Sequence, residues 1–116
     1  MPAGIDLECV LFVLLAVTLS ECAGALARGE SEFKSGRYPE AKETFASLEA
    51  EEVHWDDASR AEYALYRGLT LGALGDLTQA AVWLKEAKTI EDAHPGSLTS
   101  DNARRMKVAI EANEAP

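Results

Sequence analysis

Apolar residues recur at helical spacing along most of the chain. Two stripes are clearest, each at positions i, i+4 and i+7: Ala41, Phe45 and Leu48, and then Ala80, Leu84 and Ala87. Residues at this spacing share one face of an α-helix, so each stripe predicts an amphipathic helix. Each predicted helix follows a glycine, Gly36 or Gly75, that can end a preceding helix in the left-handed conformation. Asp76 and Gln79 have the spacing of a capping box. The pattern predicts an all-α fold of antiparallel helical hairpins.

The two predicted hairpins are related by an internal repeat. Shifted by 39 residues, the sequence matches itself at clustered positions. The identical pairs are Ala25 and Ala64, Leu26 and Leu65, Arg28 and Arg67, Gly29 and Gly68, Gly36 and Gly75, Ala41 and Ala80, Glu52 and Glu91, with Phe45 and Leu84, and Leu48 and Ala87, as conservative pairs. Gly29 and Gly68 fall inside helices, where glycine costs about 1 kcal/mol relative to alanine. We therefore expect each to allow close helix packing, with Ala41 and Ala80 as contact partners.

At these positions the chain resembles the tetratricopeptide-repeat family, whose helix-turn-helix units are about 34 residues long. The resemblance rests on Gly29, Gly36, Ala41 and Phe45 in the first copy and on Gly68, Gly75, Ala80, Leu84 and Ala87 in the second. It implies a short α-solenoid with repeats at about 22–55 and 61–94. The chain departs from the family at Ala25 and Ala64, where an aromatic residue is expected, at Glu32, where an apolar residue is usual, and in a longer linker over 51–60.

Tetratricopeptide repeats bind peptides or proteins along a groove lined by the first helices of their hairpins. For this chain the resemblance implies a groove that includes Leu26, Glu30, Phe33, Lys34, Leu65, Leu69 and Ala73. The subtype that clamps a terminal carboxylate is disfavoured, because Lys and Asn would be needed where Leu26, Glu30, Leu65 and Leu69 stand. In the alternative interpretation Phe33, Leu65 and Leu69 belong to the core. The resemblance implies a non-enzymatic interaction or scaffolding protein with a protein or peptide partner and no cofactor.

A further helix is predicted from about 99 to 113. Ala103, Met106 and Ile110 lie on one of its faces, and Arg104, Arg105, Lys107 and Glu111 lie on the other. This distribution is typical of a terminal helix that covers the last apolar face of a solenoid. Such arrays usually need about three repeats, so we expect a partner, a second copy of the chain or the N-terminal segment to complete the core.

The first 21 residues form a separate signal-like segment, ahead of a domain spanning 22–116. The run from Cys9 to Leu19 is apolar and eleven residues long, too short for a spanning helix of about 20 residues but typical of a secretory signal. The following residues up to Cys22 resemble the lipobox of bacterial lipoproteins, with Glu21 departing from the small residue that the motif has there. The resemblance implies acylation of Cys22 and a membrane anchor in the bacterial envelope, facing the periplasm. The alternative is a retained N-terminal helix on a cytoplasmic or membrane-associated adaptor.

Charge and composition narrow the function further. The 116 residues carry a net charge of -9 and are 47% hydrophobic, which fits one small folded domain. Nucleic acid is an unexpected partner for so acidic a chain, because phosphate binding depends on clustered Lys and Arg.

Residues suited to catalysis or metal binding are few. The two histidines, His54 and His94, fall in predicted connections and are interpreted as surface residues. Near His54, we expect Asp56 or Asp57 to cap the next helix, with Trp55 packed beneath it. The sequence predicts no catalytic residue and no metal site.

Overall fold

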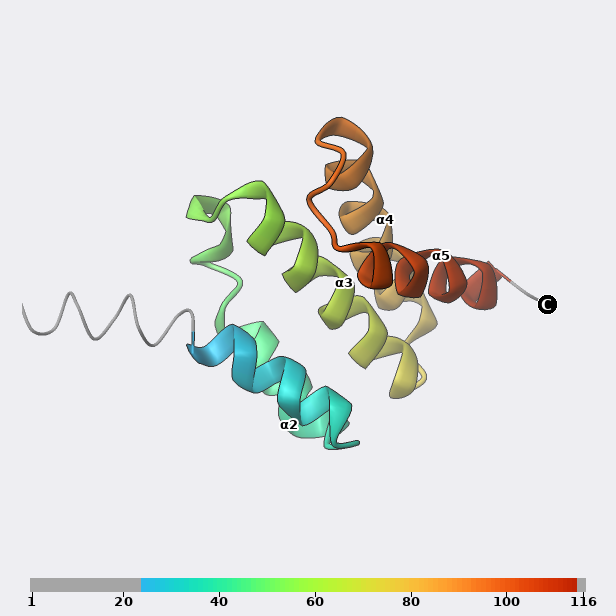
Figure 1. The fold of residues 1–116 in the computed structure, drawn as a ribbon. Helices are drawn as coiled ribbons and strands as arrows, with labels where there is room; N and C mark the ends of the chain where they lie inside the picture. Colours follow the sequence, from blue (N-terminus) through green and yellow to red (C-terminus); the bar gives the residue numbers. More distant parts are fainter. Residues whose placement is uncertain (1–23, 115–116) are drawn as a thin grey trace, which may run out of the picture.

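The computed structural model describes residues 24–114, and all regular secondary structure in that range is helical (Figure 1). The elements are a helix over 24–34, α2 (Tyr38–Ser47), the 3-10 turn η1 (Glu52–His54), α3 (Asp57–Ala73), α4 (Leu77–Ala93) and α5 (Ser100–Glu114). The predicted all-α class is confirmed, and α5 begins and ends within one residue of its predicted bounds. Residues 1–23, which include the apolar run and Cys22, and residues 115–116 lie outside the described range.

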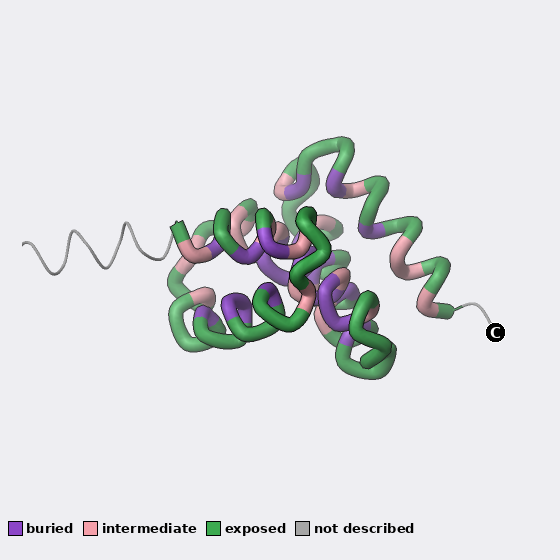
Figure 2. The backbone as a smooth tube through the Cα atoms, turned by 90° about the horizontal axis from the view of Figure 1, so that it is seen from below, coloured by how far each residue is buried: buried purple, intermediate pink, exposed green. Residues whose placement is uncertain are grey.

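Helix α3 lies at the centre of the fold. It packs against its hairpin partner α4, against α2 of the first hairpin and against α5. Helix α5 also packs against α4, so it closes the C-terminal side of the second hairpin (Figure 1). Figure 2 shows the buried positions where the helices face one another and the exposed positions on their outer sides. None of the helices in residues 24–114 combines the length and the apolar character needed to cross a membrane.

The two hairpin turns have the same geometry. Gly36 has a φ of +79° and Gly75 a φ of +86°, the left-handed conformation that the sequence predicts for both. The residue after each glycine donates its backbone N–H to a carbonyl five residues earlier. Arg37 donates to Glu32 at 2.8 Å, and Asp76 donates to Leu71 at 2.9 Å. These bonds satisfy carbonyls at the end of the first helix and turn the chain back into the second.

The start of the second helix differs between the hairpins. Asp76 caps α4, since its Oδ1 accepts a hydrogen bond from the Gln79 N–H at 3.1 Å. Within the described part of the chain no side-chain bond returns from Gln79, so only half of the predicted capping box forms. Arg37, one repeat earlier, occupies the same position with nearly the same backbone angles but provides no side-chain cap for α2.

The two glycines inside helices allow close packing, as the sequence predicts, but the side chains nearest to them are not those of the predicted partners, Ala41 and Ala80. A Cβ atom added at Gly29 would lie 2.6 Å from the ring of Phe45, and one at Gly68 would lie 2.9 Å from Cγ of Leu84. Ala41 and Ala80 are not the nearest neighbours because the larger side chain, one turn further along the second helix, crosses over the glycine. Phe45 and Leu84 are themselves one repeat apart, so both hairpins use the same contact.

Helix α3 begins at Asp57, earlier than the predicted repeat boundary at 61. The cause is the cap: Oδ1 of Asp56 accepts a hydrogen bond from the Ser59 N–H at 2.8 Å, which selects Asp56 from the two predicted candidates. Trp55 packs edge-on against Tyr63 with ring centroids 5.5 Å apart, as expected. The first turn of α3 therefore includes residues 57–60, which fall in the linker predicted from the sequence.

Two tyrosines connect α3 to its neighbours through the core. Tyr63 is fully buried, and its hydroxyl donates to the Phe45 carbonyl in α2 at 2.7 Å. Tyr66 is 1% exposed, and its hydroxyl donates to Oδ1 of Asn102 in α5 at 3.1 Å. Glu32 is buried as well, and its carboxylate accepts a hydrogen bond from the Thr44 hydroxyl at 2.6 Å.

Candidate interaction groove

The residues predicted to line a groove separate into two groups. Leu26 and Leu65 are 9% and 0% exposed and belong to the core, so the prediction that they line an accessible groove is wrong. Their side chains fill the space between neighbouring helices. Glu30, Phe33 and Leu69 are half-buried, while Lys34 and Ala73 are exposed. Phe33 and Leu69 pack against the core, but part of each side chain is still accessible to solvent. The groove interpretation therefore fits these two residues, whereas the core interpretation fits Leu65.

Phe33 and Leu69 face an open hollow of about 700 Å³ that α5 completes. We call this hollow the groove; its walls are Phe33 from the 24–34 helix, Leu69 from α3, and Asp101, Arg104, Arg105, Val108 and Ala109 from α5. The hollow is shallow and open to solvent over most of its extent. The groove thus lies between three helices that are not consecutive in the sequence.

Tyr66 lies at one side of the groove and organises the residues around it. The ring of Phe33 packs edge-on against it, with centroids 5.7 Å apart, and Nζ of Lys34 lies 5.5 Å from its centroid. On the α5 side, Oδ1 of Asn102 accepts hydrogen bonds from the Tyr66 hydroxyl and from Nη1 of Arg105, the latter at 2.9 Å. A neutral amide therefore orients Arg105 at the groove without cancelling its charge.

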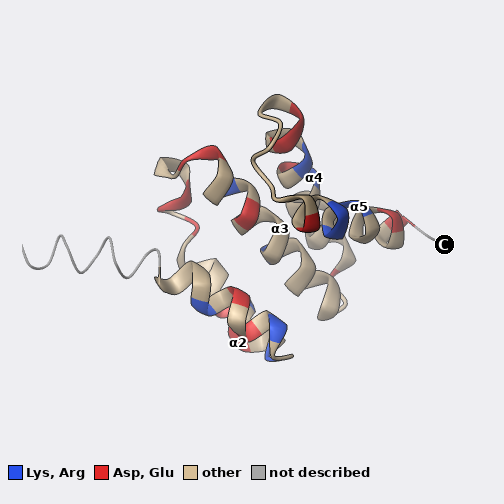
Figure 3. Ribbon diagram, in the orientation of Figure 1, with Lys and Arg blue, Asp and Glu red and all other residues tan. Residues whose placement is uncertain are grey.

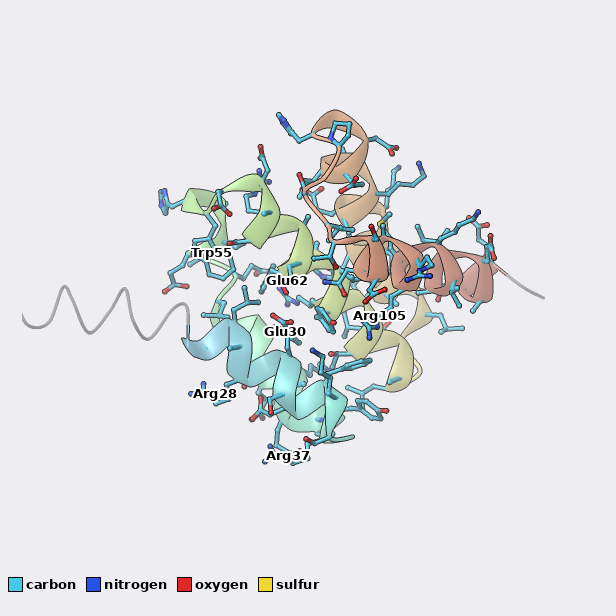
Figure 4. The ribbon with its side chains drawn as sticks, in the orientation of Figure 1. Arg28, Glu30, Arg37, Trp55, Glu62 and Arg105 are labelled. Carbon is cyan, nitrogen blue, oxygen red and sulfur yellow. The ribbon has the colours of Figure 1, made fainter. Side chains whose placement is uncertain are left out.

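Two carboxylates, Glu30 and Glu62, face each other across the 24–34 helix and α3. Figure 4 shows both, together with Arg105, in the space between the 24–34 helix, α3 and α5, while Arg28, Arg37 and Trp55 lie at the periphery. Burial, and then the charge and hydrogen bonding of Glu62, raise the pKa of Glu30 from 4.5 to about 7, against an opposing effect of Lys34. Near neutral pH, Glu30 is therefore partly protonated.

Away from the groove, three of the described lysines and arginines form ion pairs with described acidic residues, and the others form none. Arg67 pairs with Glu49 at 2.8 Å and stacks over the ring of Trp83, 4.3 Å from its centroid. Arg60 lies 3.4 Å from both Glu52 and Glu86. Figure 3 shows acidic and basic residues mixed over the helices, including the basic positions of the 24–34 helix and of α5.

Sequence reasoning missed the contribution of α5 and the role of Tyr66. Arg104 and Arg105 have the pattern of an exposed helix face, which gives no sign of a neighbour from α3. A usable signal existed on α3, since Glu62, Tyr66 and Leu69 are at i, i+4 and i+7 and mark one face. That face is the one that α3 turns toward the groove.

The two histidines of the described residues lie at the surface, and no metal-binding cluster is found among those residues. His54 and His94 are exposed, as expected for connecting segments. Within residues 24–114, no three His, Cys, Asp or Glu side chains are placed to hold a metal ion. His94 lies 3.4 Å from Asp57, and the Ser97 hydroxyl donates to the backbone carbonyl of His94 at 2.6 Å. In residues 24–114 no serine or threonine hydroxyl hydrogen-bonds the imidazole ring of either histidine.

The chain matches no protein-family model, no curated protein and no solved structure with which it was compared. Inference about its function therefore depends on the geometry of the groove.

Proposed function

We propose that the chain is a non-enzymatic interaction or scaffolding module of tetratricopeptide-repeat type that binds a protein or peptide partner in the groove. The observation that carries the proposal is the hollow of about 700 Å³, in which apolar side chains from three helices are bordered by charged ones. This combination is typical of surfaces that hold a partner through an apolar centre and a polar rim. The repeated contacts of Gly29 with Phe45 and of Gly68 with Leu84 support the repeat assignment.

Site-specific photo-crosslinking in producing cells tests the proposal. Val108 lines the groove and is 64% exposed, whereas Val82 on α4 is 54% exposed and does not line it. A photoreactive phenylalanine at 108 should form a protein adduct, and the same residue at 82 should not. Adding Leu69→Arg, which places a charge in the apolar hollow, should remove the adduct. Equal crosslinking at both positions, or an adduct that persists with Leu69→Arg, would contradict a partner in the groove.

We further propose that the chain is a small envelope lipoprotein anchored through acyl chains on Cys22. The support is the sequence from Leu19 to Cys22 after an apolar run. Each buried CH₂ of an acyl chain contributes about 0.8 kcal/mol, so two or three chains would hold the protein at a membrane. Labelling with a radioactive fatty acid should mark the wild type and not Cys22→Ala. Unlabelled wild-type protein with Met1 at its N-terminus would favour the alternative, an adaptor that retains its first helix.

A further inference from the structure

The apolar hollow of the groove adjoins two cations that form no ion pair with another described residue: Arg105 in its lining, and Lys34 beside Phe33. The carboxylate in the groove lining, Asp101, pairs with Arg104, and Lys34 acts on the Glu30 carboxylate without forming an ion pair with it. Arg105 donates instead to neutral groups, Oδ1 of Asn102 at 2.9 Å and the Tyr66 hydroxyl at 3.5 Å. Both cations lie beside the same aromatic ring, since Lys34 is 5.5 Å from the centroid of Tyr66.

The apolar part of the groove adjoins these cations. Phe33 and Leu69 are half-buried, and Val108 is the most exposed large hydrophobic residue of the described range. Covering this apolar surface with another apolar side chain would be favourable at about 25 cal/mol per Å² buried. Leu69 lies three residues after Tyr66 on α3, so the hollow and the cations are about one helical turn apart.

We infer that the groove binds a segment of another protein in which an Asp or Glu side chain stands next to a bulky apolar one. The carboxylate lies between Lys34 and Arg105, where the planar guanidinium accommodates it through paired hydrogen bonds. The apolar side chain fills the hollow between Phe33, Leu69 and Val108. This inference rests on the proposed function and adds the chemistry of the partner.

The acidic pair at the other side of Tyr66 restricts the segment further. Glu62 precedes Tyr66 by one turn of α3, and Glu30 precedes Lys34 by one turn of its own helix, a rise of about 5.4 Å. An extended peptide covers that distance in about two residues. A second acidic side chain there would be repelled, whereas a basic one would meet Glu30 and Glu62 and favour their ionised forms. The segment should therefore carry a basic or neutral residue about two positions from its acidic one.

A peptide is a better occupant of these cations than a phosphate surface. Anionic membranes and nucleic acids present many charges, and a chain with a net charge of -9 would be repelled by them as a whole. A single carboxylate placed between two cations avoids most of that repulsion. Because the chain as a whole is acidic, we expect a short segment with one carboxylate to bind here more readily than a membrane or nucleic acid with many negative charges.

The inference can be tested by selecting from a library of random twelve-residue peptides displayed on phage, with their C-termini fused, on the immobilised full-length chain. Because no free C-terminus is present, only side-chain carboxylates can be selected. We expect enrichment of Asp or Glu next to Leu, Ile, Phe or Met, without a second acidic residue two positions away. A synthetic peptide of the enriched sequence should bind at least about tenfold more weakly to Arg105→Ala.

Matched variants separate the groove from the surface of α5. Lys107→Ala removes an exposed cation of the same helix that does not line the groove, and it should leave the affinity unchanged. Arg105→Lys should retain part of the affinity, and Arg105→Glu should shift selection toward peptides with Lys in place of Asp or Glu. Melting temperatures of all variants show whether each one folds.

The outcomes distinguish the inference from the proposed function. Enrichment of basic or purely apolar peptides whose binding is lost with Leu69→Arg would overturn the inference and leave the groove as an interaction site. Peptides indifferent to both Arg105→Ala and Leu69→Arg, or no enrichment at all, would overturn the two together. Binding of anionic vesicles or RNA that Arg105→Ala abolishes would also overturn the inference.

Discussion

The two hairpins share one packing contact but differ in how much of their surface is covered. In both, a large side chain of the second helix crosses a glycine of the first, Phe45 over Gly29 and Leu84 over Gly68. Helix α3 has eight buried residues in seventeen and neighbours in α2, α4 and α5, whereas its counterpart in the first hairpin, the 24–34 helix, has three buried residues in eleven. The repeat in the sequence thus gives equal local geometry, while the position in the stack decides how tightly each hairpin is held.

The largest expected difference concerns the two crossed glycines. Gly68→Leu should destabilise the chain by about 3 kcal/mol, because a Cβ there meets the backbone N of Leu84 at 3.2 Å as well as its side chain. Gly29→Leu should cost less, since the nearest atoms belong to the side chain of Phe45 and not to the backbone. Urea denaturation measures both values.

Gly72 provides the control for these substitutions. A Cβ at Gly72 would lie 3.8 Å from the Cβ of Ala80, an ordinary contact, so Gly72→Ala should stabilise α3 by about 0.5–1 kcal/mol. If Gly29→Leu and Gly68→Leu lowered the free energy of unfolding equally, the two hairpins would be equally constrained. That result would contradict the difference between them described above.

The two core tyrosines connect α3 to opposite sides of the fold. Tyr63→Phe removes the hydroxyl that bonds the Phe45 carbonyl, and Tyr66→Phe removes the one that bonds Asn102. Each should cost about 1–2 kcal/mol, since a buried group loses its partner. Amide hydrogen exchange should rise in α2 for the first variant and in α5 for the second. If amide exchange rose in both α2 and α5 in either variant, the two regions would unfold together as one cooperative unit.

The acidic pair between the hairpins makes stability depend on pH. The pKa of Glu30 is about 7 in the folded chain against an ordinary value of 4.5, so the folded state binds more protons between these values. Stability should therefore fall as the pH rises through this range. Glu30→Gln should raise stability by about 1 kcal/mol at pH 8 and leave it unchanged at pH 4, the gain being limited because solvent screens a half-buried group.

Thermal unfolding at several pH values checks this prediction, and Glu111→Gln on the exposed face of α5 is the control. A shift of about 1 kcal/mol corresponds to several degrees in melting temperature for a domain of this size. A pH-independent gain for Glu30→Gln would contradict repulsion between Glu30 and Glu62.

The smallest effect comes from exchanging the residues at the start of the second helices. Arg37→Asp would give α2 the cap that Asp76 gives α4, because Arg37 and Asp76 have nearly equal backbone angles. The expected gain is about 0.5–1 kcal/mol, and Asp76→Arg should lose a similar amount. Chemical denaturation measures both changes; a loss in both variants would mean that the two turns are not equivalent.

Local features of the fold could be predicted from the sequence, whereas the groove required tertiary information. Gly36, Gly75 and the apolar stripes depend on neighbours within a few residues, so their helices and turns follow from spacing. The contact of Tyr66 with Asn102 joins residues 36 positions apart and leaves no local pattern. For the same reason Leu26 and Leu69 look alike in the sequence, although one is in the core and the other lines the groove.

Tyr66, a buried core residue, fixes the separation of the two walls of the groove. Its ring touches Phe33 of the 24–34 helix, and its hydroxyl reaches Asn102 of α5, so both walls are set against one buried side chain. A partner held between those walls would oppose their separation and would bind the folded chain only. At a concentration one hundred times its dissociation constant it would add about 2.7 kcal/mol to the free energy of unfolding. Thermal stabilisation can therefore report a bound partner before its identity is known.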